Sequence, residues 1–239
     1  KREIRKYPEL RELMMGKKLL FAAIAAGLFI MSGCQNNIGL SLDGKIVDQT
    51  YNSILPCADC SGIDTTILVN QDGSYVMEQS YQGTSDDNRS FFESGTWLLS
   101  KDKLTLTNSY GEKSYYLPRE DKLVMLDIDG NVINSGLNYT LAKVQPKQLA
   151  GEFTYFADAG TFKDCQSGRV YAADGLVLEK GYFATGVDGG TPVYLEVRGY
   201  YSIRPSMEDG QYDRALVVTD NKPRFDRHGS CNSRRNSRS

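Results

Sequence analysis

The sequence has few of the residues on which many enzymes depend. Its 239 residues include a single histidine, His228, which lies close to the end of the chain. A serine or cysteine nucleophile activated by histidine therefore has only one candidate base. We expect His228 to be a solvated residue of a tail. No base suited to a thiol oxidoreductase is evident either, so the sequence disfavours an enzyme.

An excess of positive charge is also missing. The chain carries 28 Lys and Arg residues against 30 Asp and Glu residues, a formal net charge of -2. A protein that neutralises many phosphates normally shows a strongly basic face, so no nucleic-acid partner is expected. The one basic cluster is formed by five Arg residues from Arg224 onward. It indicates a solvated tail, the alternative being a weak contact with acidic lipid headgroups.

No apolar run is long enough to cross a bilayer. The run Leu19–Met31 has about a dozen residues, whereas a spanning helix needs roughly 20. It follows Lys17 and Lys18 and ends at small residues, which is the order of a secretory signal peptide over residues 15–33. A buried core helix fits poorly because the run has no polar face. Residues 1–14, rich in Lys, Arg and Glu, are interpreted as an upstream extension outside the mature protein.

The four residues Met31–Cys34 resemble the lipobox of bacterial lipoproteins. The resemblance implies that Cys34 becomes the first residue of the mature protein and carries lipid. One acyl chain binds a membrane only marginally, whereas the two or three chains of such a lipid make attachment effectively permanent. Gln35 stands where Asp favours retention in the inner membrane, so the sorting machinery is expected to deliver the protein to the outer membrane, facing the periplasm. Residues 34–50 are then a lipidated tether.

Four cysteines remain once Cys34 is assigned to lipid. In an exported protein pairing is the default, and four cysteines allow three pairings. Because Cys57 and Cys60 are close in sequence, we favour a bond between them and a second bond from Cys165 to Cys231. The long loop closed by the second bond is expected to stabilise the fold by about 4 kcal/mol in the chain-entropy model.

The segment from Cys57 to Cys60 leaves three interpretations open. It is a structural disulfide, a redox sensor, or a site for copper(I) or a similar soft ion when reduced. A structural zinc site needs a second cysteine pair at suitable spacing, which the chain lacks, and a thioredoxin-like site needs a βαβ context. Met77 and Met125 are soft donors too, but their strand positions favour a role in the core.

Short alternating runs separated by turn residues predict an all-β protein. The hairpin signal Asp72-Gly73 joins two of the runs, and Asp127–Asn131 is read as a turn because an EF-hand needs further ligands. We predict a meander that closes into a barrel over residues 51–142. Its predicted strands are residues 63–69, 74–78, 103–107, 113–117, 122–126 and 138–141.

The second half of the chain is also strand-like. Residues 143–149, with Pro146, are the predicted linker because they are polar and follow the last alternating run. Strands are predicted at residues 151–156, 193–200 and 214–218, and a short helix over residues 176–184. For residues 150–239 this composition suits a small five-stranded barrel with one helix, as in an oligonucleotide/oligosaccharide-binding (OB) fold.

Several strings of residues closely resemble the NlpE family of outer-membrane lipoproteins, also called copper homeostasis protein CutF. They are residues 55–60, 95–97, 102–104, 111–116, 125–127, 138–141, 157–162 and 164–165. The resemblance covers essentially the whole mature chain up to Cys231. It implies a lipocalin-like barrel carrying the thiol pair, followed by a smaller OB-fold-like barrel closed by a disulfide. The extension before the signal peptide and the basic tail after Cys231 depart from the family.

The resemblance also implies a role in envelope stress signalling. Members are linked to copper tolerance, to surface adhesion, and to activation of the Cpx sensor kinase, through its periplasmic domain, when lipoprotein delivery or disulfide formation fails. Our first hypothesis is a noncatalytic sensor. The alternative is a copper-binding protein that uses Cys57 and Cys60, and a lipocalin-like cavity for a small apolar ligand is a further reading.

Overall fold

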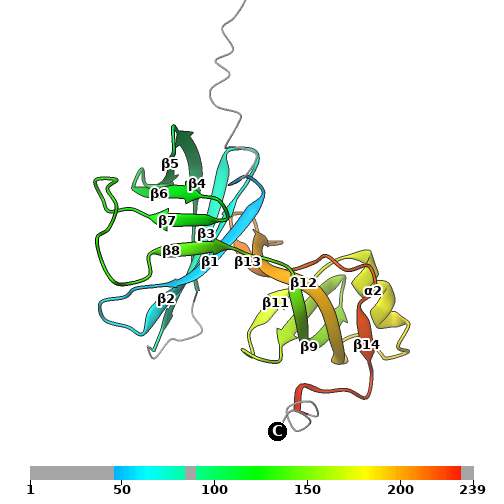
Figure 1. The fold of residues 1–239 in the computed structure, drawn as a ribbon. Helices are drawn as coiled ribbons and strands as arrows, with labels where there is room; N and C mark the ends of the chain where they lie inside the picture. Colours follow the sequence, from blue (N-terminus) through cyan, green and yellow to red (C-terminus); the bar gives the residue numbers. More distant parts are fainter. Residues whose placement is uncertain (1–45, 84–89, 233–239) are drawn as a thin grey trace, which may run out of the picture. The chain divides into compact units, whose positions relative to one another are not determined.

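The computed structural model describes residues 46–83 and 90–232, which form two β-barrels in succession (Figure 1). The predicted signal peptide, Cys34 and Gln35 lie outside the described residues. None of the helices within the described ranges combines the length and the apolar character that crossing a bilayer requires.

The first barrel is a closed meander of eight antiparallel strands. Each strand pairs with the next, and the barrel closes where Tyr51 of the first strand lies opposite Lys143 of the eighth. The strands are β1 (Gln49–Leu55), β2 (Gly62–Val69), β3 (Ser74–Gln82), β4 (Ser90–Ser100), β5 (Lys103–Asn108), β6 (Lys113–Arg119), β7 (Lys122–Met125) and β8 (Thr140–Lys143).

Side-chain alternation explains how this barrel is filled. In β5, Leu104 and Leu106 are fully buried, whereas Thr105 and Thr107 between them are only partly buried. Each buried leucine stabilises the fold by about 1.5–3 kcal/mol relative to an exposed one. Trp97 packs against the core, and its indole N–H donates to the carbonyl of Asn70 at 2.8 Å. The core consists of Ile46, Tyr51, Leu55, Ile67, Val69, Tyr75, Met77, Leu104, Leu106, Tyr116, Leu123 and Leu141.

The second barrel is smaller, with five strands in its ring. The ring runs β13-β11-β10-β9-β12 and closes through a further pairing of β12 with β13, while β14 adds to β12. Only the contact of β11 with β13 is parallel. The elements are β9 (Lys147–Phe156), β10 (Ala159–Asp164), β11 (Val170–Ala172), α2 (Leu176–Phe183), β12 (Val193–Pro205), β13 (Tyr212–Val218) and β14 (Arg224–Asp226).

Aromatic rings build the core of the second barrel. The Phe153 ring makes edge contacts with Tyr182 of α2 and with Phe225 of β14 at centroid distances of 5.7 and 5.8 Å. The buried Tyr182 hydroxyl donates to the carbonyls of Asp188 and Thr191, which satisfies its polar end. This core is separate from that of the first barrel.

Each predicted strand overlaps an observed strand and the predicted helix is confirmed, although residues 138–141 coincide with β8 (Thr140–Lys143) only at their last two residues. Other strands were missed. The sequence reading omitted β1, β4, β10, β11 and β14, of which β4 carries Gly95 in its middle and the last two have three residues each. The predicted bounds of the tether and of the linker also differ from the observed ones. Ile46 already lies in the first core, so the barrel begins within residues 34–50, and β9 begins at Lys147, within residues 143–149.

Candidate functional site: two disulfides and the polar contact between the barrels

The first pair of cysteines lies in the loop between β1 and β2. Cys57 and Cys60 form a disulfide with a Cα–Cα distance of 5.3 Å. Both cysteines are half-buried, whereas Ala58 and Asp59 between them are exposed. The pair therefore lies at the protein surface, where a small reductant or a metal ion has access from solvent.

The base of this loop is fixed on the barrel. The backbone N–H of Ser61 donates to the carbonyl of Gln82 at the end of β3, at 2.9 Å. Gly62 has a φ of +154°, and a Cβ there would lie 2.4 Å from Cγ2 of Ile54, so a larger residue would displace the loop. Cys60 thus lies two residues from a constrained backbone position.

The sulfur donors of Met77 and Met125 belong to the core. Met77 is buried within it and Met125 packs against it, as the sequence predicts. Within residues 46–83 and 90–232, no group of three or more His, Cys, Asp or Glu side chains is arranged to hold a metal ion. When reduced, the loop between β1 and β2 would offer the two thiolates of Cys57 and Cys60.

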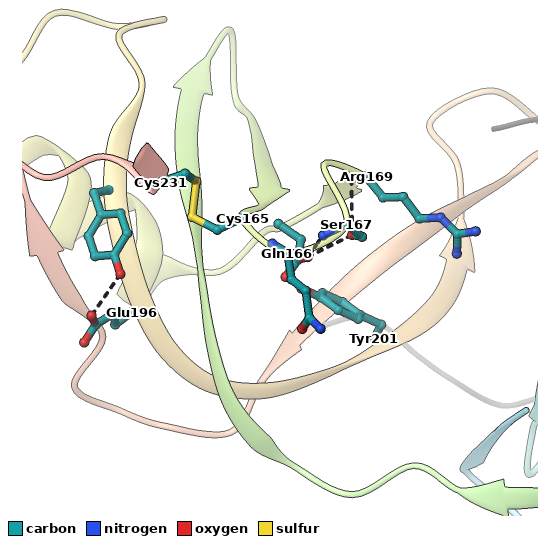
Figure 2. The surroundings of a disulfide bond; sticks show 9 residues. Cys165, Gln166, Ser167, Arg169, Glu196, Tyr201 and Cys231 are labelled. Carbon is teal, nitrogen blue, oxygen red and sulfur yellow. Dashed lines mark hydrogen bonds between the residues drawn. A yellow bond between two sulfur atoms is a disulfide. The ribbon is translucent and has the colours of Figure 1, made fainter. Parts of the chain in front are cut away.

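The second disulfide joins two segments of the smaller barrel that are far apart in sequence. Cys165 directly follows β10, and Cys231 lies beyond β14, 66 residues later, with a Cα–Cα distance of 5.2 Å (Figure 2). The N–H of Cys165 donates to the carbonyl of Ala150 in β9 at 2.9 Å. The bond therefore connects the end of the described chain to the centre of the sheet.

A tight turn next to this disulfide is organised by Asp164. Its buried carboxylate accepts hydrogen bonds from the backbone N–H of Gln166, from the N–H and hydroxyl of Ser167, and from the Tyr201 hydroxyl, the last at 2.6 Å. Burial alone would raise the pKa of Asp164, but these hydrogen bonds outweigh it and lower the pKa. Burial and the bond to Asp164 together raise the pKa of Tyr201. The turn is thus built around a charged carboxylate.

The same turn ends at Arg169, which reaches the first barrel. Its Nη1 lies 2.6 Å from Oδ2 of Asp64 in β2, and both side chains are mostly buried. Burial acts to lower the pKa of Arg169, but the hydrogen bond and the charge of Asp64 raise it. The turn that begins next to Cys165 therefore ends in an ion pair between the barrels. Figure 2 shows Arg169 at the end of this turn, together with Gln166 and Ser167.

A second ion pair joins β3 to β13. The guanidinium of Arg214 donates to the carboxylate of Glu78 and to the hydroxyl of Ser90, with both charged side chains largely buried. Nearby, the hydroxyls of Thr50 and Ser202 are hydrogen-bonded at 2.6 Å. The contact between the barrels therefore contains several buried polar pairs, and the rings of Phe92 and Tyr212 also meet across it at a centroid distance of 6.3 Å.

These contacts cover one outer surface of the first barrel. We call it the β1–β3 face and define it by the outward-facing residues Thr50, Asp64, Val76, Glu78 and Ser80. A cavity of about 160 Å³ lies beside it, and its lining includes both ion pairs. Packing between the barrels is therefore incomplete at this place.

The structure also places the other residues singled out in the sequence. His228 is exposed, as predicted, and its backbone N–H donates to the side-chain carboxylate of Asp226. Asp127 accepts from the N–H groups of Asp129 and Asn131, as in the predicted turn. The basic tail needs a correction, because Arg224 lies in β14 and pairs with Glu196, so it is part of the sheet.

Sequence reasoning missed the two ion pairs between the barrels. Glu78 and Arg214 lie 136 residues apart, and Asp64 and Arg169 lie 105 residues apart. Isolated charges on alternating strands normally point to solvent. The one available signal was the run Tyr75-Val76-Met77, because consecutive apolar residues indicate a strand that is buried on both faces.

Comparisons with known proteins match both barrels to the same family. Residues 51–136 match the NlpE N-terminal domain, and residues 143–232 match the NlpE C-terminal OB domain. The chain is 36% identical over 234 residues to lipoprotein NlpE of Escherichia coli (strain K12), covering 92% of this chain and 99% of that protein.

Two solved structures are also similar in sequence. The crystal structure of the Cpx pathway activator NlpE from Escherichia coli is 38% identical, covering 78% of this chain and all of that chain, with a TM-score of 0.35. A candidate lipoprotein from Shewanella oneidensis is 34% identical, covering 43% of this chain and 94% of that chain, with a TM-score of 0.37.

Proposed function

Because the chain belongs to the NlpE family, we propose that it is a lipid-anchored envelope protein that activates the Cpx pathway when lipoprotein delivery or disulfide formation fails. The observation that carries the proposal is the 36% identity, over nearly the full length, to a protein named lipoprotein NlpE. The similar crystallised protein is described as a Cpx pathway activator, which supports the same role.

The anchor is proposed to be lipid on Cys34. In this proposal Gln35 directs the protein to the outer membrane, away from the kinase in the inner membrane, and the pathway stays quiet. Failed delivery leaves the protein in the inner membrane. Sharing that membrane with the kinase raises the effective concentration without any new contact.

The Cys165–Cys231 bond is the proposed input for disulfide formation. Its first cysteine borders the turn of Asp164, and that turn presents Arg169 to Asp64 of the first barrel. Loss of the bond would loosen the turn and with it the ion pair. The first barrel is then the part that acts on the kinase, and the second barrel reports the folding environment.

A pathway reporter tests this function directly. We expect Gln35→Asp, which retains the protein in the inner membrane, and Cys165→Ser, which breaks the second disulfide, each to raise the reporter in otherwise normal cells. Cys34→Ala should lose fatty-acid labelling and membrane fractionation. If the reporter stays at baseline with both activating variants while the proteins accumulate normally, the proposal is wrong.

A second candidate function is binding of copper(I) by Cys57 and Cys60. The surface position of this pair and its exposed intervening residues favour it, since thiolates are soft ligands suited to that ion. Titration of the reduced protein with copper(I) should give about one ion per chain. A Cys57→Ser, Cys60→Ser double variant with unchanged affinity would exclude this site.

A further inference from the structure

We propose that the β1–β3 face is the docking surface for the partner protein, and that the partner's surface carries basic side chains that replace Arg169 and Arg214. This inference rests on the proposed function, because it states where the activated pathway component binds. It makes the second barrel a removable cover over that surface.

Three residues on the outer surface of the first barrel are buried. Val76, Glu78 and Ser80 point away from the first core, yet their exposed fractions are only 4%, 6% and 1%. A barrel wall facing solvent would leave such positions open. Part of what covers them is β13, whose Arg214 pairs with Glu78.

The β1–β3 face also carries two buried negative charges. The two carboxylates of the face, Asp64 and Glu78, each pair with an arginine of the second barrel. A buried carboxylate that loses its partner is strongly unfavourable, so the uncovered face must be either hydrated or bound to another cation. A partner that presents arginine or lysine at these two positions restores both pairs.

The way the two barrels pack allows the second barrel to separate from the β1–β3 face. Each barrel has its own hydrophobic core, so separation divides neither, although Tyr171 and Tyr201 at the edge of the second core line the cavity between the barrels. The contact contains buried polar pairs and a cavity of about 160 Å³, and within the described residues Nε of Arg204 is buried without a hydrogen-bond partner. Contacts between domains that are polar and incompletely packed permit relative motion.

These points make the two states mutually exclusive. Arg169 and Arg214 occupy the positions that the partner's basic side chains would take, so the covered protein does not bind. The apparent affinity of the partner is then its intrinsic affinity reduced by the fraction of protein that is uncovered. Changes that release the cover should tighten binding without touching the docking surface.

The test uses the purified, lipidated full chain in detergent and the periplasmic domain of the Cpx sensor kinase as the probe. Arg169→Ala with Arg214→Ala removes the cover's charges and leaves the β1–β3 face intact. We expect binding to tighten about tenfold, as the uncovered fraction rises. The matched control is Arg224→Ala, because Arg224 pairs with Glu196 inside its own barrel. It should bind like the unmodified protein.

The second arm adds Asp64→Asn and Glu78→Gln to the uncovered double variant. Binding should weaken about tenfold or more and should lose most of its salt dependence, because the charge pairs with the partner are gone. Asp121→Asn in the same background is the control, since Asp121 is an exposed carboxylate of the first barrel outside the face. Circular dichroism and Trp97 fluorescence show whether each variant is folded.

A charge exchange gives an independent readout if a variant fails to fold. Glu78→Arg with Arg214→Glu keeps an ion pair across the cover but presents the wrong charge to a basic partner. It should bind the kinase domain more weakly than the unmodified protein does. The same exchange made in the Cys165→Ser variant should weaken binding relative to Cys165→Ser alone.

The outcomes separate the two proposals. If removing the arginines tightens binding and neutralising Asp64 and Glu78 leaves it tight, the partner binds elsewhere and this inference is overturned, while the proposed function stands. If no variant binds the kinase domain, including the chain with Cys165→Ser, both fail. Tightening by the first change and loss by the second support the docking surface.

Discussion

The two disulfides of this protein differ in what they connect. Cys57–Cys60 spans three positions in a surface loop of a barrel that eight strands already close. Cys165–Cys231 spans 66 positions and ties the end of the described chain to a small barrel whose last strand, β14, has three residues. The first bond is accessible but contributes little to its barrel, and the second contributes much to the fold.

This difference indicates why a sensor would use the second bond for folding conditions. A bond that closes a long loop changes the stability of a whole domain when it is lost. A bond within a short loop changes mainly the chemistry of its sulfur atoms. Loss of each bond should show this contrast directly, and two changes of buried ionisable groups should show how the stability of each barrel depends on pH.

Loss of the long-range bond should destabilise the second barrel selectively. Cys165→Ser should lower its unfolding free energy by about 4 kcal/mol in the chain-entropy model. Trp97, the single tryptophan, lies in the first barrel, so its fluorescence should report an unchanged transition while circular dichroism shows an earlier one. Cys231→Ser should behave identically. A shift of the Trp97 transition by the same amount would mean that the barrels unfold together.

Alkaline pH should destabilise the first barrel through its buried tyrosines. Burial raises the pKa of Tyr51 to about 12 and that of Tyr116 to about 12. Their contribution is complete below the ordinary pKa near 10 and is lost as pH rises toward 12, because the unfolded chain ionises first. At pH 11 the two together should cost about 3 kcal/mol, and Tyr75, whose pKa is raised by burial and by its hydrogen bond to Glu93, adds to the loss. Urea denaturation followed by Trp97 fluorescence from pH 8 to 11 measures this loss of unfolding free energy. An unfolding free energy that does not change over this pH range would contradict the prediction.

Asp164→Asn should weaken the second barrel by about 2 kcal/mol, because it removes a charged acceptor of several hydrogen bonds. Since the pKa of Asp164 is lowered in the folded protein, its stabilisation is present above the ordinary pKa and is lost as pH falls through the folded value. Denaturation between pH 3 and 7 should show a shallower acid dependence in the variant. Equal slopes for the two proteins would argue against a charged Asp164.

Removing the short-range bond should have the smallest effect on stability. Cys57→Ser with Cys60→Ser should cost no more than about 2 kcal/mol, because the loop that the bond closes is short. The Trp97 transition of this variant, compared with the oxidised protein, provides the measurement. A loss as large as that from Cys165→Ser would remove the contrast between the two bonds.

Most of the architecture followed from local patterns. Neighbouring residues alone reveal the alternation in β5, the Asp72-Gly73 turn and the run in β9. A strand with one buried face needs a period of two, which is visible over a few residues. Strand β4 was missed because Phe91 and Phe92 break the alternation and Gly95 lies in the middle. There Gly95 is needed because a Cβ would lie 2.0 Å from the carbonyl oxygen of Thr107.

The sequence by itself determined the all-β class, the two successive barrels and the family, because these depend on periodicity and on family-specific strings. Only the tertiary structure decided which charges meet. Asp64 with Arg169 and Glu78 with Arg214 are joined across more than a hundred positions. The apolar run Tyr75-Val76-Met77 indicates that β3 is buried on both faces, but no local pattern identifies the arginines that pair with Asp64 and Glu78. A charge becomes a buried partner only when a distant strand is packed over it.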